Sequence, residues 1–444
     1  MRSRMPRKRR IAKVSGFPEC SPDEMLVFGQ WLRKITETFE EFGFAPMITR
    51  SVEEIGTITS KGADVDKEIY ALVRLEDVLA GSSKLDSRLA LHFDLTVPFA
   101  RYVAEHAGRI VFPFKRYQVQ PVWRGERAQE GRYREFYQCD VDVVDIPSAS
   151  GFYDRHTPEV ILETLSRLDI PPVVFSINDR RVLEAFYENL EIDDPVGVIR
   201  VMDKLSKAGV QATRDALIRV TKLSERQADH CLRLARIRSR DSEFVGAVRD
   251  LGATSERLDA CLHELDEVRQ YLLAREYANI RVEVDLSIAR GLDYYTGVVF
   301  EGHLQDYAGF PAICSGGRYE NLVQSLSGRS IGGVGGSIGL TRLLLKLFKE
   351  GLVEVGASSP TELALLYLPE SDAAWLRSVA GILRDRGIRV EECGGPERYD
   401  KLIKYCRRKG IKYCVYQNAE GDLKLRDLSA GHERAFDART WRAC

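Results

Sequence analysis

Apolar residues recur at helical spacing near the start of the chain. Trp31, Ile35 and Phe39 lie four positions apart, which predicts an amphipathic helix over residues 22–42. Gly43 follows this stripe and supplies a residue type that commonly ends a helix. Such a stripe indicates a helix packed on a hydrophobic core rather than a ligand site.

A different period follows at residues 89–95, where apolar and polar residues alternate. This alternation predicts a strand with His92 and Asp94 on one face. Pro98 is suited to open the helix that comes next. We therefore expect Asp94 and Thr96 where a strand meets a helix. There they can receive the ammonium group of a ligand or cap the helix.

The clearest hairpin in the sequence joins strands over residues 116–126 and 135–144. The alternation gathers polar side chains on one face of it, namely Arg124, Glu126, Gln138 and Asp142. Burying so many polar groups costs free energy unless a ligand or a partner satisfies them. The hairpin therefore predicts a binding surface, with a solvated sheet face as the alternative.

Residues 180–280 have a helical pattern almost throughout and are interpreted as an inserted helical module. Two predicted strands, 282–288 and 298–302, follow it. They flank Arg290-Gly-Leu-Asp-Tyr-Tyr-Thr-Gly297, which carries a guanidinium, a carboxylate and two phenols. Such a turn suits a phosphate and a small polar ligand, although a solvent-facing turn with an incidental arginine is the alternative.

A glycine-rich run, 332–342, ends at Arg342 and opens a leucine-rich helix. Glycine here predicts close packing of backbone beneath a flat ligand. The run is neither a P-loop nor a dinucleotide fingerprint, because the required lysine and parallel strands are lacking.

After a Gly, Ser and Pro-rich loop at 350–360, alternating strands and helices predict a small α/β domain with a mostly parallel sheet.

Composition narrows the classes of protein further. The chain has 444 residues, 44% apolar and 30% charged, with a net charge of −1. These values predict two or three globular domains and exclude a uniformly basic nucleic-acid coat. We expect no signal peptide and no membrane span, and hence a cytoplasmic protein with a flexible basic arm over residues 1–15.

The cysteines and histidines predict no metal site. The nine cysteines form no CxxC pair, and an odd number argues against a disulfide framework. His230-Cys231 and Cys261-x-His263 fit no zinc spacing.

Three segments together resemble class II aminoacyl-tRNA synthetases, and among them the histidyl-tRNA synthetase family. Val122-Trp-Arg-Gly-Glu-Arg-Ala-Gln-Glu-Gly-Arg-Tyr-Arg-Glu-Phe136 is similar to the second class II motif, and Gly336-Ser-Ile-Gly-Leu-Thr-Arg342 to the third. Arg290-Gly-Leu-Asp-Tyr-Tyr-Thr-Gly297 resembles the signature of the histidine enzymes. The resemblance implies an α+β catalytic domain on a mostly antiparallel sheet over residues 16–350, including the helical insertion. A C-terminal α/β anticodon-binding-like domain would follow over 361–444.

The same resemblance implies the roles of individual residues. It implies catalysis by Arg290 and Arg124. Histidine would be bound by Asp94, Thr96, Arg124, Gln138, Asp142, Arg290, Tyr294, Tyr295 and Tyr319. ATP would be bound by Arg124, Glu126, Arg132, Tyr133, Phe136 and Arg342. The implied substrates are histidine, ATP accompanied by Mg²⁺, and tRNA(His), and the implied assembly is a homodimer.

The chain departs from the family pattern at several points. Arg50 stands where the first motif has proline, and Asp94 and Asp142 stand where many bacterial members carry glutamate. The segment Gln417-Asn-Ala-Glu-Gly421 replaces the usual Gly-x-x-Glu of the C-terminal domain. Two alternatives therefore stay open: a regulator of histidine biosynthesis without catalysis, and an enzyme that activates histidine for an acceptor other than tRNA.

Overall fold

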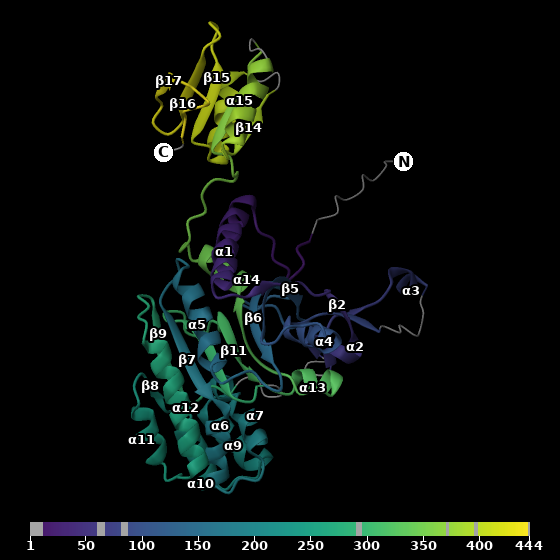
Figure 1. Cartoon of the computed structure of the whole chain (residues 1–444), viewed down its shortest axis with the longest axis vertical. Coiled ribbons are helices and arrows are strands. Elements are labelled where there is room, and N and C mark those ends of the chain that lie inside the picture. The colour runs from purple at the N-terminus through teal and green to yellow at the C-terminus, as the bar shows by residue number, and fades with distance from the viewer. Residues whose placement is uncertain are drawn as a thin grey trace, which may run out of the picture. The chain divides into compact units, whose positions relative to one another are not determined.

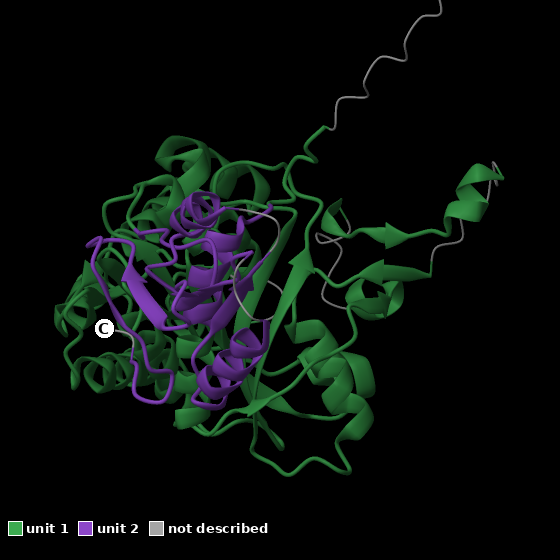
Figure 2. Cartoon of the chain, turned by 90° about the horizontal axis from the view of Figure 1, so that it is seen from above, with its two compact units in different colours: residues 1–18, 33–352 green, residues 19–32, 353–444 purple. Residues whose placement is uncertain are grey.

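The structure, a computed structural model, describes residues 12–59, 67–80, 88–289, 295–369, 373–394 and 398–442. The chain divides into two compact units (Figure 2). The first unit comprises residues 1–18 and 33–352, and the second comprises residues 19–32 and 353–444. Helix α1 (Pro22–Glu41) contributes residues to both. Among the described residues, no helix has the length and apolar character needed to cross a bilayer.

A nine-stranded sheet forms the centre of the first unit (Figure 1). Its strand order is β1-β5-β6-β12-β11-β10-β7-β9-β8. In that order the strands are Ala45–Pro46, Phe114–Trp123, Glu135–Asp145, Gly332–Gly339, Cys314–Tyr319, Val298–Leu304, Val173–Asp179, Ile280–Asp285 and Arg238–Ser239. All neighbours are antiparallel except β1–β5 and β7–β9, which are parallel. The predicted fold class, a catalytic domain on a mostly antiparallel sheet, is confirmed.

The register of β5, β6 and β12 brings polar residues from distant parts of the chain into rows. Arg116 lies opposite Asp142, and Gln118 lies opposite Asp140. On the other side of β6, Gly335 is the neighbour of Asp142. Because side chains alternate along a strand, these residues share one face of the sheet, here called the site face.

The opposite face is apolar and is covered partly by α5 (Tyr153–Ser166). A methyl group built on Gly336 would lie 2.9 Å from Phe300 Cζ and 3.1 Å from Ile161 Cγ1. One built on Gly316, the neighbour of Gly336 on β11, would overlap Phe300 and a backbone carbonyl. These glycines make room for a protein side chain on this face. Gly336 also lines a cavity on the site face, so the packing of its backbone beneath a flat ligand stays a prediction.

The helical insertion is largely as predicted. It consists of α6 (Arg180–Asn189), α7 (Pro195–Met202), α8 (Leu205–Ala208), α9 (Val210–Val220), α10 (Glu225–Leu234), α11 (Glu243–Arg249) and α12 (Glu256–Leu273). The short strand β8 lies between α10 and α11. Strands β9 and β10 are not paired with each other, because β7 lies between them. Residues 290–294, which lie between these two strands in the sequence, are outside the described residues.

A smaller sheet, with order β2-β4-β3, contacts α2 (Ile55–Ile58), which in turn contacts α4 (Thr96–His106). Its strands are Val52–Glu54, Leu89–Leu91 and Ala71–Leu72. The strand predicted over 89–95 is therefore too long, and the helix begins at Thr96 rather than at Pro98. Asp94 explains the early start, since its Oδ1 accepts a hydrogen bond of 3.1 Å from the backbone N–H of Val97.

The second unit contains a five-stranded sheet of order β14-β13-β15-β16-β17. Its elements along the chain are β13 (Leu363–Leu366), α15 (Ala373–Asp385), β14 (Val390–Cys393), α16 (Tyr399–Lys409), β15 (Tyr413–Gln417), β16 (Leu423–Asp427) and β17 (Glu433–Ala435). The first three strands in the sheet order are parallel and the last two are antiparallel. The prediction of a mostly parallel sheet is wrong for this last part, because a tight hairpin at 417–423 returns the chain antiparallel.

The glycine packing gives a first prediction. Gly316→Ala places a methyl group against Phe300 and the Gly335 carbonyl, so we expect it to lower the free energy of unfolding by roughly 1–3 kcal/mol. Gly246→Ala is the control, because this exposed glycine in α11 has no atom within 4 Å of the added methyl group. The control should raise stability slightly. Urea unfolding followed by circular dichroism measures both, and an unchanged midpoint for Gly316→Ala would contradict the packing argument.

Candidate functional site

Two adjoining cavities open on the site face of the large sheet. The smaller, of about 120 Å³, is lined by Asp94, Thr96, Arg124, Gln138, Asp140, Asp142, Tyr295, Ser315, Gly335, Gly336 and Ser337. The larger, of about 340 Å³, is lined among others by Glu68, Arg124, Glu126, Arg132, Phe136, Gln138, Asp203, Lys207, Ser315, Ser337 and Arg342. Arg124, Gln138, Ser315 and Ser337 line both, so the two cavities share a wall.

Arg124 stands at this shared wall, directly after β5. Its Nε donates a hydrogen bond of 3.0 Å to the carbonyl of Phe93, and its backbone N–H bonds the carbonyl of Arg134. The guanidinium carbon lies 5.1 Å from the centre of the Phe136 ring. These contacts fix the stem of the side chain, and a planar fork held in this way is suited to a phosphate or a carboxylate.

Asp142 forms the floor of the smaller cavity and is anchored on both oxygens. Its Oδ2 lies 2.7 Å from Nη2 of Arg116, and its Oδ1 accepts a bond of 2.7 Å from the hydroxyl of Tyr319. All three side chains are buried. Gly335 is required beside them, because a methyl group there would overlap Asp142 Oδ1.

Asp94 and Thr96 line the other side of the smaller cavity, at the start of α4. Asp94 caps this helix with one oxygen, as described above, and it remains part of the cavity wall. The sequence left open whether a helix cap or a ligand explains these residues. Asp94 combines the cap with a place in the wall, since a carboxylate can accept several hydrogen bonds.

Asp140 and Gln138 complete the β6 side of this cavity. Gln138 donates a bond of 2.7 Å from Nε2 to the hydroxyl of Ser337. Burial raises the pKa of Asp140 to about 7, against the attraction of Arg116, which lowers it. A carboxyl group in this environment changes its charge near neutral pH.

The larger cavity carries charges of both signs. Arg132 Nη1 lies 3.2 Å from Glu126 Oε2, and Arg342 Nη1 donates a bond of 2.6 Å to the carbonyl of Ala312. Burial, and secondly the nearby carboxylate of Glu126, raise the pKa of Glu68. Phe136 supplies an apolar wall, so the lining offers a ring-binding surface beside several cations.

Most residues singled out from the sequence meet at these two cavities. Tyr133 and Tyr319 do not line them: Tyr133 packs with Phe136 in a small apolar cluster, and Tyr319 lies beneath Asp142. Arg290 and Tyr294 lie outside the described residues.

Several lining residues carried no prediction. Asp140 lies in the polar alternation of the hairpin, which was a usable signal, and so does Arg116, which pairs with Asp142 behind the lining. Glu68, Asp203 and Lys207 reach the cavity from distant segments, and the sequence contains no signal for that. Within the described part of the chain, no group of three His, Cys, Asp or Glu side chains could hold a metal ion.

Known proteins are similar to this chain in sequence and in fold. The sequence profile of the family described as histidyl-tRNA synthetase matches residues 16–343. The chain belongs to this family. A histidine–tRNA ligase from Thermobifida fusca (strain YX) is 44% identical over 434 residues, which covers 97% of this chain and 98% of that protein.

Solved structures extend the family likeness to the fold. The crystal structure of histidyl-tRNA synthetase from Nostoc sp. PCC 7120 superposes with a TM-score of 0.82 at 31% identity, covering 97% of this chain and 98% of the other. A protein from Bacillus halodurans C, described as an ATP phosphoribosyltransferase regulatory subunit/histidyl-tRNA synthetase, has a TM-score of 0.74 at 20% identity, covering 92% and 99%. The second likeness shows a common fold alone.

Two departures of this histidyl-tRNA synthetase family member have structural explanations. Arg50 forms an ion pair of 2.8 Å with Glu53, whose buried carboxylate also binds Arg101 at 2.9 Å. In the segment after β15, Gln417 Nε2 donates a bond of 3.0 Å to the carbonyl of Gly421, and Gly421 has a φ of +88°. Arg50 thus helps to neutralise a buried acid, and the segment at 417–421 forms a hairpin turn.

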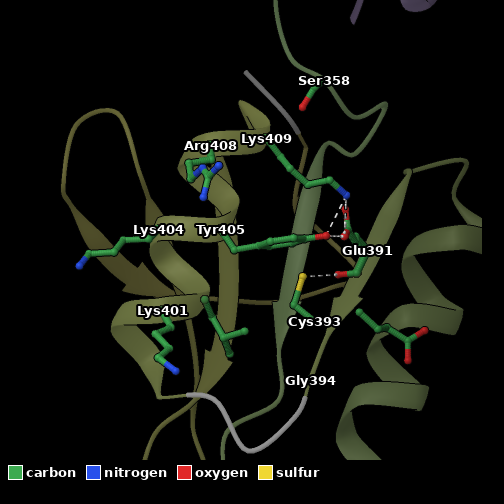
Figure 3. A pocket seen from close by; sticks show the side chains of 11 residues that line it. Ser358, Glu391, Cys393, Gly394, Lys401, Lys404, Tyr405, Arg408 and Lys409 are labelled. Carbon is green, nitrogen blue, oxygen red and sulfur yellow. Dashed lines mark hydrogen bonds and ion pairs between the residues drawn. The ribbon is translucent and has the colours of Figure 1, made fainter. Parts of the chain in front are cut away.

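The second unit has a cavity of its own, of about 890 Å³, between β14 and α16 (Figure 3). Lys409 and Tyr405 both bond Glu391 at its edge. Lys401, Lys404 and Arg408 also line it, and their spacing of three and four residues puts them on one face of α16. This basic strip is a candidate surface for phosphate groups.

The raised pKa of Asp140 predicts a pH dependence of stability. The carboxyl is protonated in the folded protein up to about pH 7 and ionises near pH 4 when unfolded, so wild type loses stability between these values. Asp140→Asn lacks this titration. Its free energy of unfolding relative to wild type should rise from pH 5 to pH 7 by at most about 1.4 kcal/mol per pH unit and then level off.

Urea unfolding of the protein without substrates, at several pH values, measures this difference. Asp145→Asn, at the end of the same strand and outside both cavities, is the control and should show no such rise. A difference for Asp140→Asn that stays constant from pH 5 to pH 8 would contradict the raised pKa.

Proposed function

We propose that the protein is a histidine–tRNA ligase. It activates L-histidine with ATP to form histidyl-adenylate and transfers the histidyl group to tRNA(His). The single observation that carries the proposal is the shared wall at Arg124, which lines a small polar cavity and a larger cavity with cations and an aromatic ring. One guanidinium is thereby available to the amino-acid carboxylate and to the α-phosphate with which it reacts.

The first step needs positioning rather than a general base. A carboxylate oxygen of histidine attacks the α-phosphorus, a new P–O bond forms, and the bond to pyrophosphate breaks. Because the carboxylate is already a nucleophile, the protein has to align it and stabilise the charge on the phosphoryl oxygens. Arg124 and Arg290 take this role at the α-phosphate, and Arg342 binds the departing phosphates. In the second step a hydroxyl of the tRNA attacks the acyl carbon and AMP leaves.

Adenine and imidazole are bound by different parts of the wall. Phe136 stacks on adenine, with Glu126, Arg132 and Tyr133 on the loop beside it. Asp94, Thr96, Gln138 and Asp142 bind the amino acid, with Tyr294 and Tyr295 at its ring. Tyr319 acts from beneath, through its hydrogen bond to Asp142. Polar side chains around an imidazole reject a ligand of similar shape without N–H groups, since such a ligand strands buried acceptors.

The remaining partners follow from this activity. Mg²⁺ enters bound to the phosphates of ATP, as part of the substrate. Glu68 and Glu126, which line the larger cavity, are carboxylates of the type that Mg²⁺ accepts. We further propose a homodimer that works in the cytoplasm, with residues 16–350 as the catalytic domain and residues 361–444 as the anticodon-binding domain.

Two other functions remain distinguishable by experiment. A non-catalytic regulator of histidine biosynthesis would show neither histidine-dependent pyrophosphate exchange nor charging of tRNA. An enzyme with another acceptor would show exchange without charging. Retention of Arg290 and of the second unit favours the ligase over the regulator, because such regulators typically lack both.

Arg124 provides the test of the first step. Arg124→Ala should lower kcat/KM for histidine-dependent pyrophosphate exchange by about 100-fold or more, the scale of removing one oriented electrostatic group. Arg124→Lys should recover only part of the loss, since it keeps the charge and not the planar fork. Arg127→Ala, in the exposed part of the same loop, is the control and should leave exchange unchanged. An Arg124→Ala enzyme within a few-fold of wild type would exclude this mechanism.

The basic strip on α16 provides the test of the tRNA contact. Combining Lys404→Glu with Arg408→Glu should raise KM for tRNA by about tenfold or more, because two phosphate contacts become repulsive. Pyrophosphate exchange, which requires no tRNA, should stay at the wild-type rate. Arg377→Glu, an exposed residue on α15, is the matched charge control. If the double variant charges tRNA with the KM of wild type, the strip does not contact tRNA.

A further inference from the structure

Asp140 has a place in the smaller cavity that neither the sequence motifs nor the family resemblance gave it. It lies on β6 between Gln138 and Asp142, with all three side chains on the site face. Its neighbour on β12 is Ser337, and its neighbour on β5 is Gln118. The side chain is 3% exposed, and this small remaining surface belongs to a residue that lines the cavity.

Two acceptors at this wall have no donor. Among the described residues, Asp140 Oδ1 and Gln138 Oε1 are buried and have no hydrogen-bond partner. A buried acceptor without a donor costs about 1–3 kcal/mol, so it is expected where a ligand supplies the missing hydrogen. An occupant with N–H groups fits these two acceptors.

The carboxylate oxygens of Asp142 already have more hydrogen-bond donors than those of Asp140. Each of its oxygens has a donor within the protein, one from Arg116 and one from Tyr319. Asp140 has an oxygen without any donor two residues away on the same face. For a ring that enters this part of the cavity, Asp140 offers the less saturated acceptor.

The charges around Asp140 favour a nitrogen-bearing group. Asp94 and Asp142 line the same cavity. Two cations oppose these acids, namely Arg124, which lines the cavity at the Gln138 end, and Arg116, which pairs with Asp142. Asp142 and Asp94 also contribute to the raised pKa of Asp140, and Arg116 opposes this. Excess acid in a cavity of about 120 Å³ attracts a polarised or cationic N–H group and repels an acidic side chain.

The position along β6 identifies which part of histidine meets Asp140. Arg124 lies at the Gln138 end of the row and takes the carboxylate of the amino acid under the proposed function. Successive residues on one face of a strand are spaced by about 6.6 Å. The side chain of the substrate, extending from Arg124 into the smaller cavity, thus passes Asp140 before it reaches Asp142.

We propose that Asp140 is a further histidine-binding residue, which accepts a hydrogen bond from an imidazole N–H of the substrate. Asp142 and Asp140 then form two acceptors for the ring, and Asp140 contributes to the selection of histidine over amino acids without a nitrogen-bearing side chain. This inference rests on the proposed function, because it assigns a residue within the same site.

The test compares the isosteric variant Asp140→Asn with wild type in pyrophosphate exchange. Above pH 7, where the Asp140 carboxyl is ionised, loss of a charge-assisted hydrogen bond should raise KM for histidine by about tenfold or more and leave KM for ATP unchanged. Asp145→Asn on the same strand is the matched control and should behave as wild type. An unchanged KM for histidine in Asp140→Asn overturns the inference, whereas a wild-type protein without exchange activity overturns the proposed function itself.

Two competitive inhibitors distinguish the ring from the α-ammonium group. Histamine retains the ring and an ammonium group, and imidazolepropionate retains the ring and lacks the ammonium group. If Asp140 binds the ring, Asp140→Asn weakens inhibition by both compounds to a similar degree. Weakening of histamine alone would place Asp140 at the ammonium group and overturn the assignment to the imidazole.

Discussion

The buried ion pair between Arg116 and Asp142 is the interaction on which the site face of the first unit depends. A charged pair without solvent is costly to form, because both partners lose their hydration. Here the guanidinium lies 4.3 Å from the centre of the Phe99 ring, and the carboxylate has a second donor in Tyr319. Removal of either partner would leave a charge in the core, so the pair fixes how β5 and β6 are aligned.

The alignment explains why glycine is needed on the neighbouring strand. Asp142 lies opposite Gly335, and only a residue without a side chain leaves space for its anchored carboxylate. On the opposite face Gly336 and Gly316 leave space for Phe300. Strand β12 thus separates the polar site from the apolar core. Gly335 leaves space on the polar face, and Gly336 together with Gly316 of β11 leaves space on the apolar face.

The sequence was informative where the relevant signal was local. The alternation along residues 116–126 and 135–144 was sufficient to place Gln138 and Asp142 on one polar face, and the helical pattern identified the insertion. Prediction from the sequence failed where an element boundary or a contact depended on tertiary neighbours. The early start of α4 depends on a single bond from Asp94, and the antiparallel end of the second sheet depends on the hairpin turn near Gly421. Asp203 and Lys207 reach the larger cavity because of how the insertion packs, and no local pattern encodes that.

The wall that Arg124 provides to both cavities has a thermodynamic consequence. Two ligands that contact the same side chain cannot bind independently, because each changes the position and the charge that the other encounters. By linkage, any gain in affinity that histidine gives to ATP is returned in equal measure by ATP to histidine. Under the proposed function the shared guanidinium therefore couples the two substrates, and the size and sign of this coupling are the same whichever substrate binds first.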